Sequence, residues 1–386
     1  MHLNYLKDFI LTDKRVLLRL DLNTPVEGGE VINDERIIRS LPTINYILQK
    51  GGKLKIISHL GRPKETKKDQ PEFSLDPVAK KLSQLLNIPV PLIPDLDNTE
   101  NPNSGSLILY ENIRFFAGEK ENNKSLSKKL GSLCDIFVMD AFATSHRAHS
   151  STTGVVHYAP NSCIGFLVEE ELAVLSKLRA SSIKPSLAIL GGAKISTKLE
   201  LINELSSQMD FVFLGGGIAN TCFAAQGYSI GNSLIESNML DEARELVSKK
   251  NVILPNKVVV SNSVDGNPRI TDLQSINDNE AIFDIAPDIV NELELIFRES
   301  KIILWNGPMG LFEKEQFMDG TKSIAELIIS SSAYSVAGGG DTISAASKLG
   351  ILNSFDYVST AGGAFLEYIE GRNLPALEAL QLKALE

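Results

Sequence analysis

The hydrophobic positions of this chain follow two alternating patterns. Short apolar runs, such as residues 16–20 (VLLRL) and 187–190 (LAIL), predict buried strands. Between such runs, apolar residues recur every three or four positions, which predicts helices at 34–50, 77–86, 125–133, 198–205, 218–225 and 342–349. In the first of these helices the expected apolar stripe is Ile37, Ile38, Leu41, Ile44 and Ile47/Leu48. This alternation is typical of βαβ units and predicts parallel sheets.

The residues that follow the apolar runs differ between the two halves of the chain. In the first half the runs lead into basic or polar residues, at 21–23, 58–62, 111–114 and 147. In the second half they lead into glycines, at 191–192, 215–217, 338–340 and 362–363. Open parallel sheets bind ligands beyond the carboxyl ends of their strands. The sequence therefore predicts two binding edges, one made of guanidinium groups and one made of bare backbone.

We expect an α/β fold with two doubly wound, Rossmann-like parallel-sheet domains joined by a helix hinge. A helix is expected at 169–180, because Leu172, Leu175 and Leu178 are periodic and acidic residues open its first turn. The predicted divisions are an N-terminal domain at 1–168, an interdomain helix and linker at 169–185, a C-terminal domain at 186–365, and a tail at 366–386. The tail is amphipathic, so we expect it to dock back on the N-terminal domain.

Composition narrows the class of protein. The 386 residues are 43% hydrophobic, and no apolar run approaches the roughly 20 residues that span a bilayer. We expect no membrane segment and no signal peptide, and the three cysteines form no CxxC pair, which predicts a cytoplasmic protein. The net charge of −10 argues against nucleic-acid binding.

The charge is unevenly distributed along the chain. Residues 1–168 contain 21 Lys or Arg and 19 Asp or Glu, whereas residues 169–386 contain 17 and 29. A nearly neutral half with arginines at its strand ends suits a small anionic ligand. The alternative is a surface asymmetry without function.

The first candidate group lies at the end of the 16–20 run. On a strand Arg19, Asp21 and Asn23 share one face, and the leucines between them share the other. An Arg-x-Asp pair is often only a structural ion pair. The position of Asn23 at the strand end favours a binding role for Asp21 and Asn23, with Arg19 structural.

Further basic residues occupy comparable positions. His59 and Arg62 lie in a Gly-Pro turn, Arg114 and Arg147 follow two other runs, and Arg36 opens a helix, where it opposes the macrodipole. Arginine forks suit phosphate and carboxylate, so these residues predict a site for a small phosphorylated acid. The spacing of His146 and His149 also permits a metal, although structural hydrogen bonding is favoured because no further ligand is evident.

The second half offers a different set. The segment 191–198 (GGAKISTK) follows a strand and is expected to open a helix, with Lys194 and Lys198 on one helical face as a phosphate site, or else as a solvated face. Asp341 can meet a Mg²⁺ carried by a nucleotide, with Thr342 near the phosphates, or simply cap a helix. Glu313 can accept hydrogen bonds from a ribose.

Seven segments together resemble the phosphoglycerate kinase family, over residues 16–375. They are RLDLNTP at 19–25, SHLGRP at 58–63, ENIRF at 111–115, DAFATSHRAHS at 140–150, GGAKISTK at 191–198, WNGPMGLFE at 305–313 and GGGDT at 338–342. The resemblance implies reversible phosphoryl transfer from 1,3-bisphosphoglycerate to ADP, giving 3-phosphoglycerate and ATP with Mg²⁺. It also implies that the N-terminal domain binds phosphoglycerate, that the C-terminal domain binds nucleotide, and that hinge closure brings them together.

The resemblance implies roles for individual residues. Phosphoglycerate would be bound by Asp21, Asn23, Arg36, His59, Arg62, Arg114 and Arg147. Arg36 and Lys194 would act on the transferring phosphoryl group. The nucleotide would be bound by Lys198, Gly215, Gly216, Pro308, Leu311, Glu313, Gly339, Gly340, Asp341 and Thr342, and Asp341 would meet the Mg²⁺-nucleotide.

The departures from the family pattern are Thr24, Ala143 and Thr197, none of which is expected to carry chemistry. We expect a monomer with no nucleic-acid or membrane partner. Two rival functions are weaker. A bilobal anion-binding protein without catalysis would not need Lys194, Lys198 or Asp341, and a nicotinamide dehydrogenase would need the missing G-x-G-x-x-G spacing.

Overall fold

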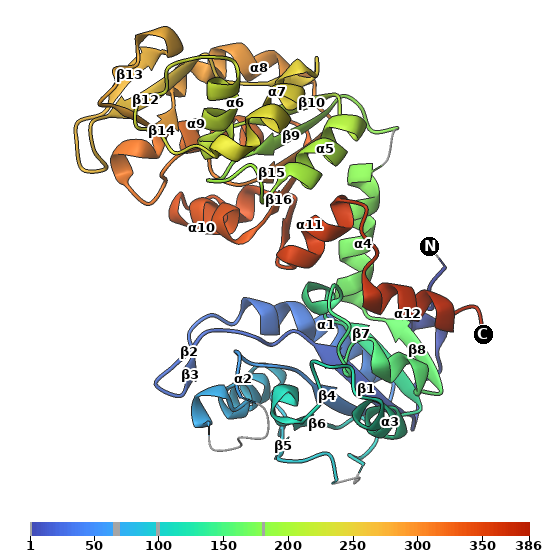
Figure 1. Cartoon of the computed structure of the whole chain (residues 1–386). Helices are drawn as coiled ribbons and strands as arrows, with labels where there is room; N and C mark the ends of the chain where they lie inside the picture. Colours follow the sequence, from blue (N-terminus) through green and yellow to red (C-terminus); the bar gives the residue numbers. More distant parts are fainter. Residues whose placement is uncertain (1, 65–69, 98–100, 180–181) are drawn as a thin grey trace. The chain divides into compact units, whose positions relative to one another are not determined.

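The computed structural model describes residues 2–64, 70–97, 101–179 and 182–386 (Figure 1). The chain forms two compact units. Unit 1 contains the chain up to Ala173 together with Asn373–Glu386, and unit 2 contains Val174–Arg372. The boundary falls within helix α4 (Phe166–Arg179). Among the described residues, no helix has both the length and the apolar character needed to cross a membrane.

Unit 1 is built on a sheet of six parallel strands. Their order is β5 (Leu92–Ile93), β6 (Leu107–Tyr110), β4 (Lys53–Ile57), β1 (Arg15–Leu20), β7 (Ile136–Asp140) and β8 (Asn161–Ile164). The helices of this unit are α1 (Glu35–Gln49), α2 (Asp76–Leu86), α3 (Lys124–Ser132) and α12 (Pro375–Lys383). A short antiparallel hairpin joins β2 (Val26–Glu27) to β3 (Glu30–Val31). Single-turn 3₁₀ helices are η1 (Leu6–Asp8), η2 (Pro71–Phe73), η3 (Ile113–Phe115), η4 (Phe142–Thr144) and η5 (Gly154–His157).

The core of unit 1 explains its helices. Alternate residues of β1, among them Leu18 and Leu20, pack in one cluster with apolar residues of α1 and α2. Within α1, Ile37, Ile44 and Ile47 are buried as the periodicity predicted, whereas Ile38 is 46% exposed. The prediction was wrong at Ile38 because two adjacent helical residues diverge by about 100° around the axis. Helix α12 packs on β8 and η5, and its Ala376 N–H donates to the carbonyl of Ser145 at 3.1 Å.

Unit 2 repeats this architecture with a second sheet of six parallel strands. Their order is β11 (Val252–Ile253), β10 (Phe211–Leu214), β9 (Ser186–Leu190), β15 (Ile302–Asn306), β16 (Tyr334–Gly338) and β17 (Tyr357–Ser359). Its helices are α5 (Leu199–Gln208), α6 (Gly216–Ala225), α7 (Leu240–Ser248), α8 (Val290–Glu299), α9 (Asp319–Ser330), α10 (Gly340–Lys348) and α11 (Gly363–Ile369). The 3₁₀ turns are η6 (Ser237–Met239), η7 (Leu273–Ser275), η8 (Pro287–Ile289), η9 (Glu315–Phe317) and η10 (Leu352–Ser354). Two parallel α/β sheets, as expected from the sequence, are therefore confirmed.

Unit 2 also contains a small antiparallel sheet that the sequence did not predict. Its order is β13 (Arg269–Asp272), β12 (Lys257–Ser261) and β14 (Ala281–Ile285). Val258 and Val260 face a separate apolar cluster that includes Phe223 of α6. This sheet was missed because its runs are short, β13 is largely exposed, and the expected βαβ rhythm offered no place for an antiparallel sheet.

Helix α4 begins three residues before the predicted start at Glu169. The cap comes from a distant residue: Asp140, at the end of β7, accepts hydrogen bonds from the N–H groups of Leu167 (2.9 Å) and Val168 (3.1 Å). A cap supplied across the fold leaves no local signal in the sequence. The predicted end at Ala180 lies outside the described residues.

Candidate active site

The predicted anion-binding residues of unit 1 gather at one edge of its sheet. Strands β6, β4, β1 and β7 are neighbours, so their carboxyl ends meet. Asp21 and Asn23 follow β1, and His59 and Arg62 follow β4. Arg114 lies in η3 after β6, Arg147 follows η4 after β7, and Arg36 lies in the first turn of α1. We call this set of seven residues the anion face.

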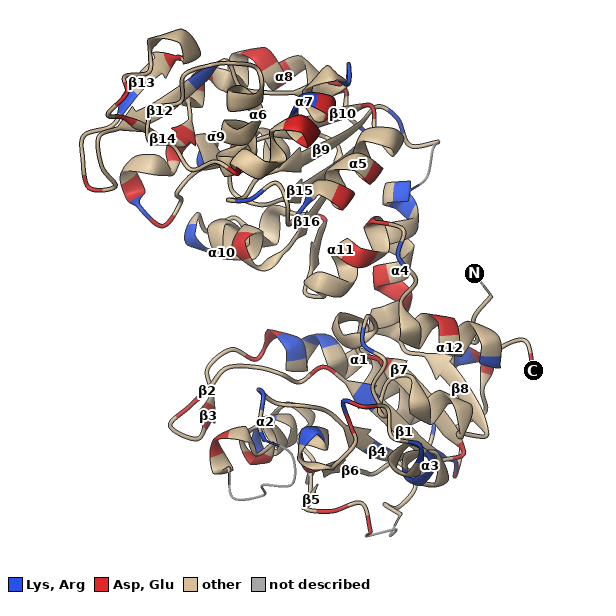
Figure 2. Cartoon of the chain, viewed as in Figure 1, with Lys and Arg blue, Asp and Glu red and all other residues tan. Residues whose placement is uncertain are grey.

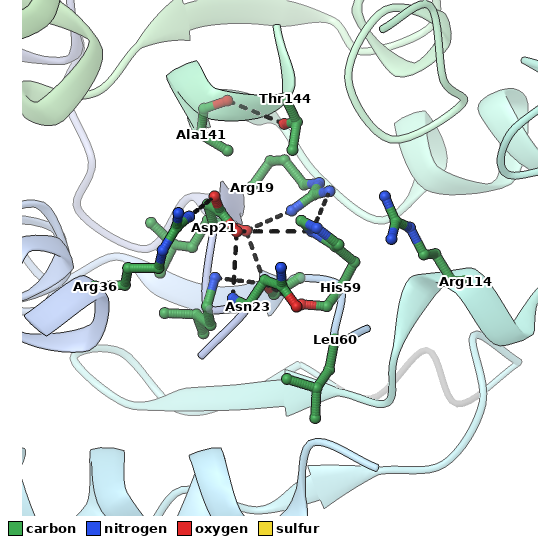
Figure 3. A network of polar contacts seen from close by, with 12 residues as sticks. Arg19, Asp21, Asn23, Arg36, His59, Leu60, Arg114, Ala141 and Thr144 are labelled. Carbon is green, nitrogen blue, oxygen red and sulfur yellow. Dashed lines mark hydrogen bonds and ion pairs between the residues drawn. The ribbon is translucent and has the colours of Figure 1, made fainter. Parts of the chain in front are cut away.

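Asp21 is the centre of the hydrogen bonds on the anion face (Figure 3). Its carboxylate accepts from Arg36 Nη1, and its Oδ1 accepts from the Asn23 N–H at 3.2 Å. His59 Nδ1 lies 3.8 Å from the same oxygen and 3.3 Å from Arg19 Nη2. One carboxylate thus orients Arg36 and lies beside His59, while Arg19 lies behind them, only 1% exposed.

The loop after β4 is tied to the same group of residues. Asn23 Oδ1 accepts from the Gly61 N–H at 2.8 Å, and Arg114 Nη1 donates to the Gly61 carbonyl. Gly61 has φ +57°, and a Cβ there would lie 2.4 Å from the Phe73 ring, so this tight turn requires glycine. Arg62 is exposed at the end of the turn.

Burial and crowding of positive charge alter the titration of the anion face. Burial lowers the pKa of His59 well below its ordinary value, and Arg19, Arg114 and Arg147 lower it further. Burial, followed by the charges of Arg147 and Arg19, likewise lowers the pKa of Arg114 to about 10. His59 is therefore neutral at pH 7, and its Nδ1 accepts from Arg19. Cationic groups that destabilise one another in this way would be stabilised by a bound anion.

Two buried residues behind the anion face were missed by the sequence reasoning. Glu119 is fully buried, and it accepts from the Ser151 N–H at 3.0 Å and from Ser151 Oγ at 2.6 Å. Ser151 Oγ in turn accepts from Arg19 Nε at 3.0 Å. Burial raises the pKa of Glu119 to about 7 despite the neighbouring Arg19. Glu119 lies in a polar segment, 118–124 (GEKENNK), so the sequence does not mark it as a buried partner of Ser151.

The two histidines that suggested a metal lie beside other protein side chains. Arg147 Nε donates to His146 Nε2 at 3.1 Å, and His149 Nδ1 lies 3.7 Å from Glu119. Burial and nearby arginines lower the pKa of His149 to about 4. Among the residues that the structure describes, no three His, Cys, Asp or Glu side chains gather as metal ligands.

Unit 2 contains a pocket of about 500 Å³ at the carboxyl edge of its sheet. Strand order changes direction between β9 and β15, and the loops after β9, β10, β15 and β16 contribute to the lining. Predicted residues in the lining are Gly216, Pro308, Leu311, Glu313 and Asp341. A pocket at such a topological switch point is where doubly wound sheets bind their ligands.

The glycines of this edge allow its loops to approach one another. A Cβ on Gly191 would lie 1.9 Å from the Pro308 carbonyl oxygen, and one on Gly217 would lie 2.3 Å from the Ala193 carbonyl oxygen. The Gly216 N–H donates to the Met309 carbonyl at 3.0 Å, and Gly215 is the N-cap of α6. The glycines therefore build the walls of the pocket, in addition to any room they leave for a ligand.

The two candidate lysines do not share a helical face, so that prediction was wrong. Residues 191–198 form a loop, and α5 begins only at Leu199. Lys194 is exposed, whereas Lys198 Nζ is turned inward and donates to the carbonyls of Gly191 (2.6 Å) and Asn306 (3.0 Å). Burial lowers the pKa of Lys198 to about 8, although Asp341 raises it.

The third glycine loop opens α10 directly. Gly339 is the N-cap with φ +97°, and Gly340 and Asp341 occupy the first turn. Asp341 is exposed, whereas Thr342 is buried and its Oγ1 accepts from the Gly307 N–H (2.7 Å) and donates to the Gly338 carbonyl (2.8 Å). The Thr342 hydroxyl thus fixes the loop, and Asp341 faces the pocket.

Some of the pocket lining was not foreseen from the sequence. Phe283 and Ile282 come from β14 of the unpredicted antiparallel sheet, and Asn220 and Phe223 come from α6. Lys348 Nζ fixes the loop that carries Glu313, because it donates to the carbonyls of Phe312 (2.9 Å) and Glu313 (3.0 Å). The run at 281–285 (AIFDI) is short and does not alternate, so the sequence does not mark β14.

The positions of charged residues can be followed along the ribbon of each unit. Figure 2 shows Lys and Arg on α1 and α3 of unit 1, and Asp and Glu on α5 and α8 of unit 2. Fold and sites together define a two-unit α/β protein with a basic anion face on one parallel sheet and a glycine-walled pocket on the other.

Comparisons with known proteins extend this description. The phosphoglycerate kinase family model matches residues 6–372. Curated phosphoglycerate kinases include one from Baumannia cicadellinicola, 45% identical over 98% of each chain, and one from Coxiella burnetii, 46% identical over 97% of this chain and 98% of the relative. The solved Coxiella burnetii structure has a TM-score of 0.95 over 99% of this chain and all of the other, at 45% identity. That of Pyrococcus horikoshii has a TM-score of 0.82 over 98% of each chain, at 33% identity.

The chain belongs to the phosphoglycerate kinase family. It is a phosphotransferase that transfers a phosphoryl group reversibly between 1,3-bisphosphoglycerate and ADP in glycolysis. Neither a non-catalytic anion-binding protein nor a dehydrogenase is supported by these findings.

Proposed function

We propose that the anion face of unit 1 binds 3-phosphoglycerate or 1,3-bisphosphoglycerate, and that the pocket of unit 2 binds ADP or ATP. In terms of the predicted divisions, residues 1–168 would hold the phosphoglycerate and 186–365 the nucleotide. The observation that carries the proposal is the convergence of Arg36, Arg114 and Arg147 around His59 at one sheet edge, where burial and then these charges lower the pKa of His59. Each charge-assisted hydrogen bond to the ligand would contribute roughly 1.5–3 kcal/mol.

On this proposal Arg36 and Lys194 act on the transferring phosphoryl group. A β-phosphate oxygen of ADP attacks the phosphorus of the acyl phosphate, and the bond from phosphorus to the carboxyl oxygen breaks. The carboxylate of 3-phosphoglycerate leaves, and ATP is formed. The protein supplies positioning and charge neutralisation, and no covalent intermediate is needed. Closure of the two units would bring the reactants together and exclude water.

The side chains of unit 2 fit a Mg²⁺ that arrives on the nucleotide. Mg²⁺ usually binds one or two carboxylates together with substrate phosphates, and the exposed Asp341 carboxylate lines the pocket at the start of α10. Bound there, the ion would neutralise phosphate charge. Glu313 would accept from the ribose, and Lys198 and the first N–H groups of α10, near Gly340 and Thr342, would bind phosphate oxygens. We further propose that the protein acts as a cytoplasmic monomer.

A crossed pair of variants tests this division of labour. Isothermal titration of the full chain with 3-phosphoglycerate should show roughly 10- to 100-fold weaker binding for Arg114→Ala, with Mg-ADP binding within about twofold of the wild type. Asp341→Asn should weaken Mg-ADP binding by a similar factor and leave 3-phosphoglycerate binding within about twofold of the wild type. Arg298→Ala, on the exposed surface of α8, is the matched control and should change neither. If Arg114→Ala weakened both ligands equally, or neither, the assignment of the two sites would be wrong.

A further inference from the structure

The loop that carries Lys194 is held on its N-terminal side by α6. The Ile218 N–H donates to the Gly192 carbonyl at 3.2 Å, and Gly217 approaches the Ala193 carbonyl so closely that no side chain fits between them. Lys194 itself is exposed and lies outside any helix. Its backbone position therefore depends on what fixes the loop on its other side.

A single carboxylate fixes that other side. Glu236 accepts from the Ser196 N–H through Oε2 at 2.9 Å and from Ser196 Oγ through Oε1 at 2.6 Å. Hydrogen bonds to an ionised group are among the strong ones in proteins, and two from one residue fix orientation as well as distance. Ser196 is two residues after Lys194, so this clamp acts within the same short loop.

Glu236 is itself anchored to α6. Its N–H donates to Thr221 Oγ1 at 3.3 Å, and Thr221 Oγ1 donates to the Gly217 carbonyl at 3.1 Å. The contacts thus form a closed path. It runs from Thr221 of α6 through Glu236 to Ser196, along the loop past Lys194 to Gly192, and back to α6 through the Ile218 N–H. The carboxylate remains ionised: partial burial raises its pKa, but the Ser196 hydrogen bonds and the Lys194 charge give a net lowering.

We propose that Glu236 is a positioning residue for Lys194, which holds the lysine loop against α6 so that the ammonium group meets the transferring phosphoryl group in one geometry. The inference rests on the proposed role of Lys194. Glu236 is absent from the pocket lining, so its effect should appear in the catalytic step and not in nucleotide affinity.

The test is steady-state kinetics of Glu236→Gln and Ser196→Ala in the full-length enzyme. In Glu236→Gln the carboxamide can still accept from the Ser196 N–H and donate to the Ser196 hydroxyl, but neither bond is strengthened by the carboxylate charge any longer. We expect kcat to fall about 10- to 100-fold, which is the effect of a displacement near 1 Å, while KM for Mg-ADP and for the acyl phosphate stays within about threefold. Glu236→Asp keeps the charge and should recover part of kcat. Glu245→Gln, on exposed α7, is the control and should match the wild type.

A double variant distinguishes a positioning role of Glu236 from a general disturbance of the fold. In a Lys194→Ala background, Glu236→Gln should lower kcat by less than about twofold more, because the group that it positions is gone. An undiminished further loss would overturn the inference. If Glu236→Gln does not fold, Ser196→Ala carries the same test.

The two proposals fail differently. If Lys194→Ala leaves kcat unchanged, the proposed role of Lys194 is wrong, and the inference falls with it. If Lys194→Ala lowers kcat strongly while Glu236→Gln and Ser196→Ala leave it unchanged, the role of Lys194 stands and only the positioning role of Glu236 is wrong.

Discussion

Units 1 and 2 place different groups at the carboxyl edges of two similar sheets. Unit 1 presents charged side chains, such as Arg36 and Arg114, at the ends of β1, β4, β6 and β7. Unit 2 presents glycines, apolar walls and the first turn of α10. The first edge should be sensitive to removing atoms, because its function depends on side chains. The second should be sensitive to adding atoms, because its function depends on close backbone approach.

The two edges resemble each other in how they fix their loops. In unit 1, Ser58 Oγ accepts from the Leu22 N–H at 2.9 Å and donates to the Leu20 carbonyl at 2.8 Å. In unit 2, the buried Thr342 hydroxyl performs the same pair of functions for Gly307 and Gly338. Both edges thus use a buried hydroxyl to hold a loop, although the residues around the two loops differ.

The largest effect should come from removing a side chain at the first edge. On its proposed role, Arg36→Ala is expected to lower kcat about 10³-fold, because it removes a positive charge that would lie beside the transferring phosphoryl group. Steady-state kinetics with 3-phosphoglycerate, ATP and Mg²⁺ measures this. Arg39→Ala, one turn further along α1 with an ion pair to Glu170 at 3.6 Å, should change kcat by less than twofold. Equal losses for the two variants would show that α1 responds as a whole and that Arg36 has no special role.

At the second edge, adding one methyl group should disturb both folding and nucleotide binding. Gly191→Ala places a Cβ 1.9 Å from the Pro308 carbonyl and 2.7 Å from Met309 Cε, so the loops after β9 and β15 must separate. We expect about 3 kcal/mol of lost unfolding free energy and weaker Mg-ADP binding. Denaturant unfolding and titration measure the two effects.

Gly340→Ala is the matched control for Gly191→Ala, because it also adds one methyl group at a glycine of this edge. The protein has nothing within 4 Å of a Cβ at Gly340, so the unfolding free energy should stay within about 0.5 kcal/mol of the wild type. Nucleotide affinity alone should fall if phosphate approaches the start of α10. Equal destabilisation by both substitutions would refute the backbone argument for Gly191.

The sequence predicted the sheets and both binding edges, since strand ends and their residues are local features. Asp21 and Asn23 could be placed after the 16–20 run, and Asp341 beside its glycines. The expectation that Arg19, Asp21 and Asn23 share one strand face was wrong, because β1 ends at Leu20. What failed depended on distant partners. The start of α4 is set by Asp140, the exposure of Ile38 by packing around α1, and the loop at 191–198 by contacts with Pro308 and α6. Glu119, Glu236 and the β14 residues of the pocket could not be found, because no periodic pattern marks a carboxylate or a short strand that acts across the fold.

Lys198 is a cationic side chain at the carboxyl edge of unit 2, which is otherwise built largely from glycines and apolar residues. Its lowered pKa predicts that nucleotide binding depends on pH. Burial lowers that pKa to about 8, so the free enzyme loses this charge above pH 8. On the proposed role of Lys198, a nucleotide phosphate binds its charged form, so KM for ADP should rise above pH 8 by up to about tenfold per pH unit and stay flat between pH 6.5 and 7.5. Lys198→Arg remains charged and should flatten the profile. A rise of the same size in that variant would assign the titration to another group.

The smallest effect is expected from Thr24, where this chain departs from the family pattern. Thr24 is 5% exposed, and its hydroxyl donates to the Asn33 carbonyl. Asn33 Oδ1 then accepts from the Glu35 N–H at 3.0 Å, so this contact sets where α1 begins, one residue before Arg36. Thr24→Val keeps the shape of this buried side chain but removes its hydrogen bond to the Asn33 carbonyl, which should lower the unfolding free energy by about 1 kcal/mol. Because Asp21 still orients Arg36, KM for 3-phosphoglycerate should change by less than about twofold. A large change in KM with unaltered stability would contradict this prediction. It would mean that the carboxyl edge of unit 1 depends on exact backbone position, as the carboxyl edge of unit 2 does.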